Sequence, residues 1–171
     1  MAKRTGVLLT QLGTPKAPTV SAVRPFLREF LTDARVIDIP APARYALVNL
    51  IIAPFRAPKS TKIYQELWEA GEGESPILTY TKELVEMLNT RLADDHITVH
   101  MAMRYQQPAM ADVLEEMRLL NYDKILVLPM FPQYASSSSG SAMQRALEVM
   151  SRWWVIPELE VVSQFYDEEF Y

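Results

Sequence analysis

The stretch KILVLPMFPQYASSSSGSAMQRALEVM, residues 124–150, decides the fold class of this protein. Residues 124–131 are almost continuously apolar, which is typical of a strand buried on both faces of a parallel sheet. Four serines, a glycine and a helical pattern then follow. A buried strand that leads directly into a helix predicts a strand–helix–strand crossover, so this stretch favours an α/β fold.

The same alternation continues on both sides of this stretch. Further strands are predicted at 6–12, 97–104 and 158–165, and helices at 19–33, about 42–53, 59–70, 77–93, 109–121 and 141–154. We therefore expect one domain over 1–171, an α/β three-layer sandwich with a four-stranded parallel sheet in the order 2-1-3-4. Thr19 or Ser21 is expected to cap the first helix, with Pro25 in its first turn. Pro54 and Pro58 are expected to end the second helix.

Composition excludes several classes of function. The net charge of −4 provides no general basic surface, so a nucleic-acid partner is not expected. The chain has no cysteine, which excludes disulfides, thiolate metal ligands and a cysteine nucleophile within it. Residues 1–15 do not resemble a signal peptide, and a cytoplasmic location is expected. The apolar run 45–55 is too short to span a bilayer, although a peripheral membrane contact stays open.

The last residues, 164–171, follow the fourth predicted strand and begin a pattern typical of a helix N-terminus. This pattern predicts that the chain is one half of a larger protein. Such a half would expose apolar surface that the other half covers, and we expect this surface to favour self-association.

Ligands of open parallel sheets bind beyond the carboxyl ends of the strands, where the strand order reverses. Leu12, Arg104 and Tyr105 lie at two of these ends, and the serine run follows a third. Serines at the start of a helix offer hydroxyls and free backbone amides to an anion, but they are equally common as plain caps. Both interpretations of the run therefore remain open. Arg56 is likewise either a solvated charge or an anchor for an acidic ligand.

The two histidines do not form a predicted metal site. His96 and His100 are four residues apart, and His100 lies in a predicted strand, where four residues span about 13 Å. No arrangement of nucleophile, base and orienting group emerges from the sequence. We therefore expect neither a metal site nor a catalytic residue in this chain.

Four blocks together resemble the ferrochelatase family in order and spacing. They are GVLLTQLGTPKAPTVSAVRPFLREFLTDARVIDIP (6–40), FRAPKSTKIYQELWEAGEGESPI (55–77), MRYQQP (103–108) and VLPMFPQYASSSSGSA (127–142). The resemblance implies an enzyme that inserts ferrous iron into protoporphyrin IX to form protohaem. It also implies two similar α/β lobes with the porphyrin in the cleft between them, and this chain corresponds to the N-terminal lobe.

The resemblance implies seven porphyrin-binding residues. These are Leu12 beside the porphyrin face, Arg56 near the propionates, Tyr64 at the pocket edge, Ser75 in the pocket lining, Arg104 and Tyr105 at the cleft floor, and Ser137 in the serine run. Ser138 or Ser139 is expected to cap the following helix.

The family's metal-inserting histidine belongs to an S-x-H-G-x-P-like block that this chain lacks. The resemblance therefore implies porphyrin binding here, a C-terminal lobe as partner, and little or no turnover by this chain alone. Ferrous iron is a substrate and no cofactor is expected. Some relatives carry a cysteine where this chain has Ser136, so no iron–sulfur cluster is expected through that position. A non-catalytic α/β module that binds another ligand or partner remains the alternative.

Overall fold

The computed structural model describes residues 3–169. Within this range the chain divides into two compact units. The sheet unit consists of the described residues within 1–12, 81–104 and 108–171, and the helical unit consists of residues 13–80 and 105–107.

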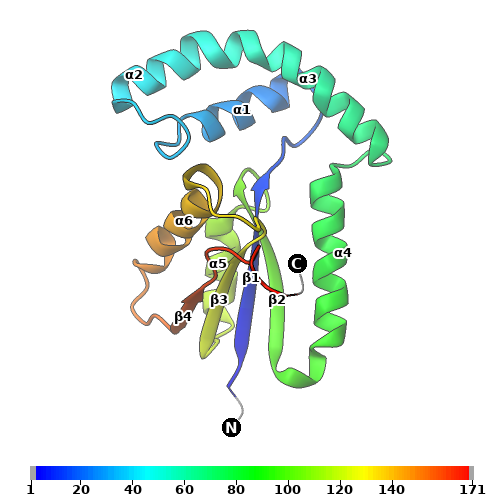
Figure 1. Ribbon diagram of the computed structural model, residues 1–171, viewed down its shortest axis with the longest axis vertical. Helices are drawn as coiled ribbons and strands as arrows, with labels where there is room; N and C mark the ends of the chain where they lie inside the picture. Colours follow the sequence, from blue (N-terminus) through cyan, green and yellow to red (C-terminus); the bar gives the residue numbers. More distant parts are fainter. Residues whose placement is uncertain (1–2, 170–171) are drawn as a thin grey trace. The chain divides into compact units, whose positions relative to one another are not determined.

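The sheet unit is built on four strands: β1 (Thr5–Gly13), β2 (Ile97–Tyr105), β3 (Lys124–Pro129) and β4 (Glu158–Val161). The last residues of β1 and β2 belong to the helical unit. The strands form one parallel sheet in the order β2-β1-β3-β4 (Figure 1). This confirms the predicted fold class and strand order.

Two helices, α5 (Met110–Leu119) and α6 (Ser141–Met150), cover one face of this sheet. Helix α5 buries Met110, Val113, Leu114 and Met117, the i, i+3, i+4 and i+7 positions of one helical stripe. They pack against Leu8 of β1 and the buried residues of β3. Each fully buried side chain of this kind contributes about 1.5–3 kcal/mol to stability.

Helix α4 (Pro76–Arg91) runs beside the edge strand β2 (Figure 1). Its Asn89 side chain accepts a hydrogen bond from the Val99 backbone N–H at 2.7 Å and donates one to the Val99 carbonyl at 2.9 Å. One amide side chain thus satisfies two backbone groups that the edge of a sheet leaves unpaired.

The helical unit contains α1 (Val20–Leu31), α2 (Ala41–Ala46) and α3 (Ala53–Ala70), with a π-helical segment, Leu47–Ile52, between α2 and α3. Helices α1 and α3 lie side by side (Figure 1). Helix α1 begins as expected, because Thr19 Oγ1 accepts a bond from the Ala22 N–H. Pro25 was predicted in the first turn but lies in the second.

The prediction that Pro54 and Pro58 end a helix is wrong, because the chain is helical without a break from Ala41 to Ala70. In the wider π turn, the Ala53 N–H bonds to the Val48 carbonyl five residues back. The α pattern restarts at Ala53, and Pro54 lies in the first turn of α3 without ending the helical run. Pro58 lies inside α3 and removes one hydrogen bond there.

Two predictions near the end of the chain also need correction. Strand β4 ends at Val161 rather than at 165. Residues 166–169 form a turn, not the start of a helix, and residues 170–171 lie outside the described part. No helix within residues 3–169 is long and apolar enough to cross a membrane.

Candidate functional site

The seven predicted site residues fall into both units. Leu12, Arg104 and Ser137 belong to the sheet unit, whereas Arg56, Tyr64, Ser75 and Tyr105 belong to the helical unit. The geometry of each group follows from its own unit.

In the sheet unit, Arg104 connects the end of β2 with the start of α6. Its Nε donates to Ser141 Oγ at 2.7 Å and to the Ser141 carbonyl at 3.2 Å. Strand β1 lies between β2 and β3, so this bond reaches across the carboxyl end of β1. These bonds bring the end of β2 close to the start of α6, the helix that follows β3.

Arg104 and Tyr105 are consecutive residues of one strand, so their side chains point to opposite faces of the sheet. Arg104 shares the face of Ala102, which belongs to the core under α5 and α6. One crevice therefore cannot receive both side chains directly from the strand.

The serine run is itself helical. Ser136–Gly140 form a π-helical turn that continues directly into α6. The residue before the turn, Ala135, offers no side-chain cap, and the predicted cap role of Ser138 or Ser139 is wrong. The Ser138 hydroxyl points back to the Ala135 carbonyl at 3.5 Å. In the π turn, the Gly140 N–H bonds to the Ala135 carbonyl, five residues earlier, at 3.0 Å. The Gly140 N–H therefore needs no hydrogen bond to a side-chain cap.

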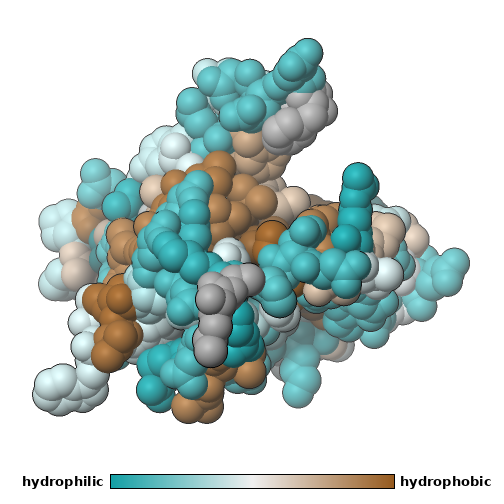
Figure 2. All heavy atoms as spheres, turned by 90° about the horizontal axis from the view of Figure 1, so that it is seen from below, coloured by the Kyte–Doolittle hydropathy of each residue, from teal (hydrophilic) through white to brown (hydrophobic). Residues whose placement is uncertain are grey.

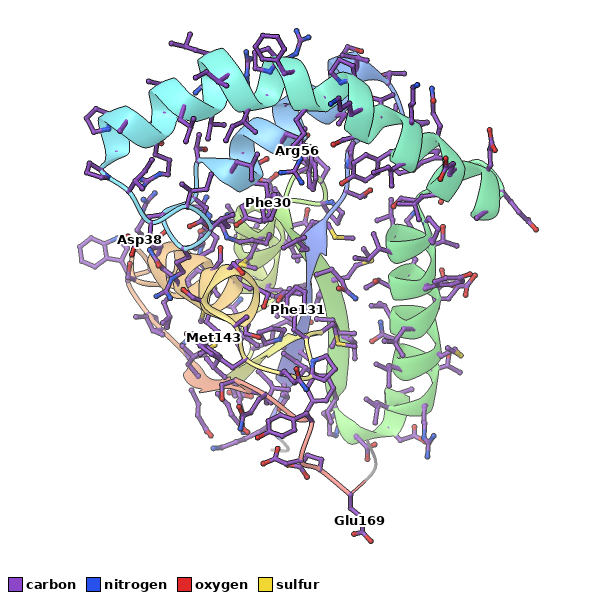
Figure 3. The ribbon with its side chains drawn as sticks, turned by 45° about the horizontal axis from the view of Figure 1, so that its top comes forward. Phe30, Asp38, Arg56, Phe131, Met143 and Glu169 are labelled. Atoms are coloured by element: carbon purple, nitrogen blue, oxygen red, sulfur yellow. The ribbon has the colours of Figure 1, made fainter. Side chains whose placement is uncertain are left out.

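The serines differ in exposure. Ser136 is exposed, Ser137 is half-buried and Ser139 is completely buried. The Ser139 hydroxyl has no hydrogen-bond partner within the described part of the chain, which is costly for a buried polar group. Leu12, at the end of β1, is half-buried. Phe131 after β3 and Met143 on α6 add apolar and thioether groups near this end of the sheet (Figure 3).

In the helical unit, five aromatic side chains form a row of ring contacts. Neighbouring centroids are 5.3–6.2 Å apart, and the row runs Tyr105, Phe30, Phe26, Tyr64, Trp68. Three of the four contacts are edge-to-face, the arrangement that the ring quadrupoles favour. The row joins two of the predicted site residues, Tyr64 and Tyr105.

Tyr105 is completely buried at one end of this row. Its hydroxyl donates to Asp33 Oδ2 at 2.8 Å, and its ring stacks edge-on against Phe30. Next to it, Gln106 adopts a positive φ of 67° and donates both its backbone N–H and its side-chain amide to one carboxylate oxygen of Glu29. The connection that follows β2 is therefore held rigidly within the helical unit.

Arg56 is exposed on α3 (Figure 3), two turns before Tyr64. Burial raises the pKa of the Tyr64 hydroxyl, and the Arg56 guanidinium partly offsets this rise. The positive charge of Arg56 thus lowers the pKa of the Tyr64 hydroxyl, but burial is the larger effect. Tyr64 therefore stays a neutral hydrogen-bonding group at physiological pH. An exposed cation next to an aromatic row suits a flat ligand that carries a carboxylate.

Ser75 is buried, and its hydroxyl shares a 2.8 Å hydrogen bond with the Thr14 hydroxyl. The Ser75 carbonyl also accepts the first backbone bonds of α4, from Leu78 and Thr79. Ser75 borders a cleft of about 390 Å³ within the helical unit. The cleft is lined by Thr14, Pro15, Lys16, Trp68, Gly73, Glu74, Ser75, Leu78, Gln106 and Gln107. Of the seven predicted residues, Ser75 alone lines it.

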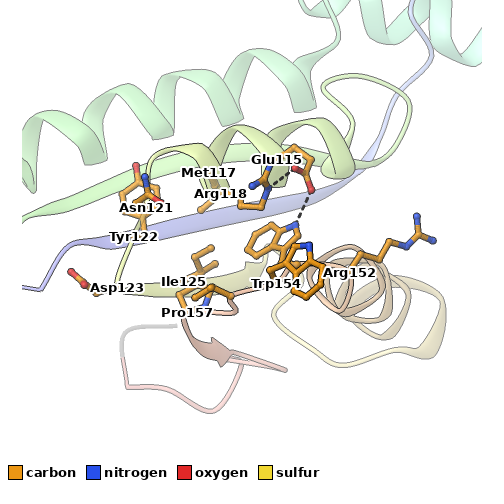
Figure 4. A pocket seen from close by; sticks show the side chains of 12 residues that line it. Glu115, Met117, Arg118, Asn121, Tyr122, Asp123, Ile125, Arg152, Trp154 and Pro157 are labelled. Carbon is orange, nitrogen blue, oxygen red and sulfur yellow. Dashed lines mark hydrogen bonds and ion pairs between the residues drawn. The ribbon is translucent and has the colours of Figure 1, made fainter.

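A larger cavity, of about 730 Å³, lies at the opposite, amino-terminal edge of the sheet (Figure 4). None of the seven predicted residues lines it. Because ligands of parallel sheets bind at the carboxyl edge, we assign the candidate site by strand geometry and not by cavity size.

Neither histidine takes part in a cluster suited to a metal. His100 Nε2 lies 2.9 Å from the Tyr122 hydroxyl, and His96 is exposed in a left-handed conformation after a short 3₁₀ turn. Residues 3–169 contain no group of three or more histidine, cysteine, aspartate or glutamate side chains that could hold a metal ion.

Sequence reasoning missed the aromatic row as a unit. The spacing held a clue, since Phe26 and Phe30, like Tyr64 and Trp68, are i, i+4 pairs that lie on one helical face. The contact between the two pairs, Phe26 to Tyr64 at 5.9 Å, depends on the packing of α1 against α3. Asp33, the partner of Tyr105, gave no clue in the sequence, because it lies 72 positions away.

Comparison with known proteins agrees with these features. The ferrochelatase family profile matches residues 4–171. Ferrochelatase of Legionella pneumophila (strain Corby) is 40% identical over 168 residues, covering 98% of this chain and 49% of the relative. Ferrochelatase of Azoarcus sp. (strain BH72) is 42% identical over 169 residues, covering 98% of this chain and 46% of the relative. Ferrochelatase 2 of Shewanella oneidensis (strain ATCC 700550 / JCM 31522 / CIP 106686 / LMG 19005 / NCIMB 14063 / MR-1) is 41% identical over 167 residues. This match covers 96% of this chain and 50% of the relative.

The chain thus spans about half the length of the curated relatives it matches. The family match covers nearly the whole chain, including the two strand ends and the serine run that carry the candidate site. The chain belongs to the ferrochelatase family.

Proposed function

We propose that this chain is the porphyrin-holding half of a ferrochelatase that inserts ferrous iron into protoporphyrin IX. The family match over residues 4–171 carries this proposal. The half-buried rings of Tyr64 and Trp68 and the exposed Arg56 on the same helix support it, because a flat macrocycle with carboxylate side chains needs an apolar wall and a cation.

In this proposal the residues of the chain bind and orient the substrate. Tyr64 offers a neutral phenol at the edge of the wall, and Arg56 pairs with a propionate carboxylate. In the sheet unit, Leu12 and Ser137 are further candidate porphyrin contacts at the carboxyl end of the sheet. Arg104 acts through Ser141, since its bonds to that residue hold the start of α6 and with it the serine run.

Tyr105 and Ser75 take positioning roles in this proposal. The Tyr105 hydroxyl is engaged by Asp33 and the Ser75 hydroxyl by Thr14, and both residues are buried. They fix the walls on which the macrocycle lies. This differs from the direct contacts that the family resemblance implied for both residues.

Iron insertion replaces two pyrrole N–H bonds with Fe–N bonds and releases two protons, so the reaction needs a base. We assign no base to residues 1–171 and place it in the half of the relatives' length that lies outside the match to this chain. This chain alone then binds porphyrin with little or no turnover. We also propose no iron–sulfur cluster through Ser136, since thiolates are the usual protein ligands of such clusters and a hydroxyl is not.

Porphyrin titration of the full-length protein, followed by absorbance, tests the binding proposal, with an adenine nucleotide as the control ligand. Saturable spectral change with porphyrin and none of comparable affinity with the nucleotide supports it. Preferential binding of the nucleotide would instead favour a different ligand-binding module.

The variant Arg56→Ala tests the role of the cation. A propionate contact is made equally in the ground and transition states, so its loss should raise KM while kcat is nearly kept. Arg91→Ala, which removes an exposed arginine from the last turn of α4, is the matched control and should change neither constant. A fall in kcat at unchanged KM would show that Arg56 acts on the insertion step itself.

A further inference from the structure

Two buried hydroxyl groups of the sheet unit have no hydrogen-bond partner. Thr10 on β1 and Ser139 in the π-helical turn before α6 are both at 0% of their full accessibility. Neither Thr10 Oγ1 nor Ser139 Oγ has a partner within residues 3–169. An unpaired hydroxyl in a protein interior is costly, and such groups are normally bonded to protein, to water or to an ion. The two hydroxyls are therefore candidates for holding a ligand.

The strand register places Thr10 near the carboxyl end of the sheet, on the face that α5 and α6 cover. Thr10 pairs with Pro129, the last residue of β3, and its carbonyl accepts the Met130 N–H at 2.8 Å. Leu8, two residues earlier on the same face, belongs to the core beneath these helices. The Thr10 hydroxyl thus points toward the helix layer, away from the amino-terminal edge of the sheet, which Figure 2 shows as mixed hydrophilic and hydrophobic surface.

Ser139 lies on the face of its helical run that packs on the sheet. It precedes Ala142 by one helical turn and Ala146 by two, and both alanines belong to the same core. The complete burial of Ser139 agrees with this placement. Its hydroxyl therefore faces the sheet at the carboxyl end, where the Thr10 hydroxyl also lies.

Arg104 borders the same place from β2. It shares the face of Ala102, a core residue, and its Nε donates to the Ser141 hydroxyl at 2.7 Å. Strand β1 lies between β2 and β3, and α6 follows β3, so this bond crosses the carboxyl end of β1, where Thr10 lies. Thr10, Ser139 and Arg104 thus converge beneath the start of α6.

The charges around these two hydroxyls favour a negatively charged ligand. Arg104 carries a guanidinium, and the helical run from Ser136 through α6 directs the positive end of its dipole to this place. Strands β1 and β2 and residues 124–144 contain no aspartate or glutamate. Asp112, in the first turn of α5, is exposed, so water screens its charge. A hydroxyl binds an anion through its hydrogen and a cation through its oxygen, and the surrounding charge selects the anion.

We propose that the hydroxyls of Thr10 and Ser139 bind a small inorganic anion of the size of chloride, between the sheet and the start of α6. Both hydroxyl oxygens are closed to solvent, which excludes an organic anion with a bulky substituent. The ion pairs both hydroxyls and offsets the positive charge of the helix start. This inference does not rest on the proposed porphyrin chemistry, because the site is complete within the sheet unit.

Thermal unfolding of the full-length protein tests this inference, in buffers where chloride replaces gluconate at constant ionic strength and without porphyrin. A ligand that binds only the folded state stabilises it, so Tm of the native protein should rise with chloride and follow a saturable single-site curve. Replacing sodium with potassium at constant chloride should leave Tm unchanged. Crystals soaked in bromide should show an anomalous peak within hydrogen-bond distance of Thr10 Oγ1 and Ser139 Oγ.

Two variants remove one hydroxyl each. Thr10→Val keeps the branched shape of the side chain, and Ser139→Ala leaves the helical turn in place. Each should weaken the apparent chloride affinity about tenfold or more, the effect of losing one hydrogen bond to a charged group. Each protein is compared with itself with and without chloride, because loss of an unpaired hydroxyl keeps or raises Tm in the absence of the ion.

Ser151→Ala is the matched control. It removes an exposed hydroxyl at the opposite end of α6, where Ser151 Oγ donates to the Glu148 carbonyl at 3.0 Å, and should keep the native response to chloride. A native Tm that does not depend on chloride would overturn the proposal. An equal dependence in the native protein and both variants would also overturn it, since it would be a general salt effect. A response that follows the cation, or bromide-soaked crystals with only water at the two hydroxyls, would likewise exclude the anion.

Discussion

The hydroxyl of Tyr105 should stabilise the helical unit independently of any ligand. Tyr105→Phe removes the 2.8 Å bond to Asp33 and keeps the ring and its contact with Phe30. A hydrogen bond to a charged group contributes about 1.5–3 kcal/mol. Asp33 is half-buried, and its other oxygen accepts the Arg35 N–H at 2.8 Å, so the carboxylate keeps one partner and some contact with water. We therefore expect a loss near the lower limit, about 1.5 kcal/mol.

For a protein of this size, a loss of that magnitude lowers Tm by about 3–6 °C. Urea unfolding followed by circular dichroism should show a lower midpoint at an unchanged slope, since the surface exposed on unfolding stays the same. Tyr134→Phe is the control, because Tyr134 is 49% exposed and should lose almost nothing. If Tyr105→Phe is as stable as the native protein, the Tyr105–Asp33 bond contributes nothing net. If it is stable but binds porphyrin much more weakly, the hydroxyl contacts the ligand and the positioning role is wrong.

Three further predictions follow from single positions. Gly13→Ala should cause a large fall in Tm, because φ at this position is +114° and an added Cβ would lie 2.0 Å from the Tyr105 carbonyl oxygen. A Tm equal to that of the native protein would contradict this geometry. Ser139→Ala should keep or raise Tm, because it removes a buried hydroxyl without a hydrogen-bond partner in the described part of the chain. Ser137→Ala should weaken porphyrin binding in an absorbance titration at unchanged Tm. If Ser139→Ala instead weakens binding and Ser137→Ala leaves it unchanged, Ser139 and not Ser137 is the ligand contact. Burial lowers the pKa of His100, with a smaller opposing effect of a nearby carboxylate, so the unfolded chain binds more protons than the folded protein just below pH 6.5 and the free energy of unfolding should fall as pH decreases there. His100→Asn should therefore make the urea midpoint depend less on pH in this range. A pH profile as steep as that of the native protein would refute this prediction.

The sequence alone determined the fold class and the strand order of this protein. The apolar run 124–131 and the helical pattern after it are local features, and their periodicity reflects which faces become buried. The parallel sheet in the order β2-β1-β3-β4 and the Thr19 cap agree with those predictions. Family membership was also visible, because it rests on the order of sequence blocks.

Helix boundaries at prolines and in the serine run were decided by hydrogen-bond register. A π turn displaces the backbone bonds by one residue, so Pro54 can lie in the first turn of a new α segment without ending the helical run. The same kind of turn makes Ser136–Gly140 helical without a side-chain cap. No single residue type specifies a π turn, and local propensity therefore predicted a break at the prolines and a side-chain cap in the serine run.

The arrangement of the candidate site residues was decided by tertiary packing. The Arg104–Ser141 bonds join positions 37 residues apart, and the Tyr105–Asp33 bond joins positions 72 apart. The sequence could name Arg104 and Tyr105 through family resemblance, but not their partners. Partners so distant in the chain meet because strands and helices pack side by side, and the energy of that packing, rather than local periodicity, selects which side chains touch.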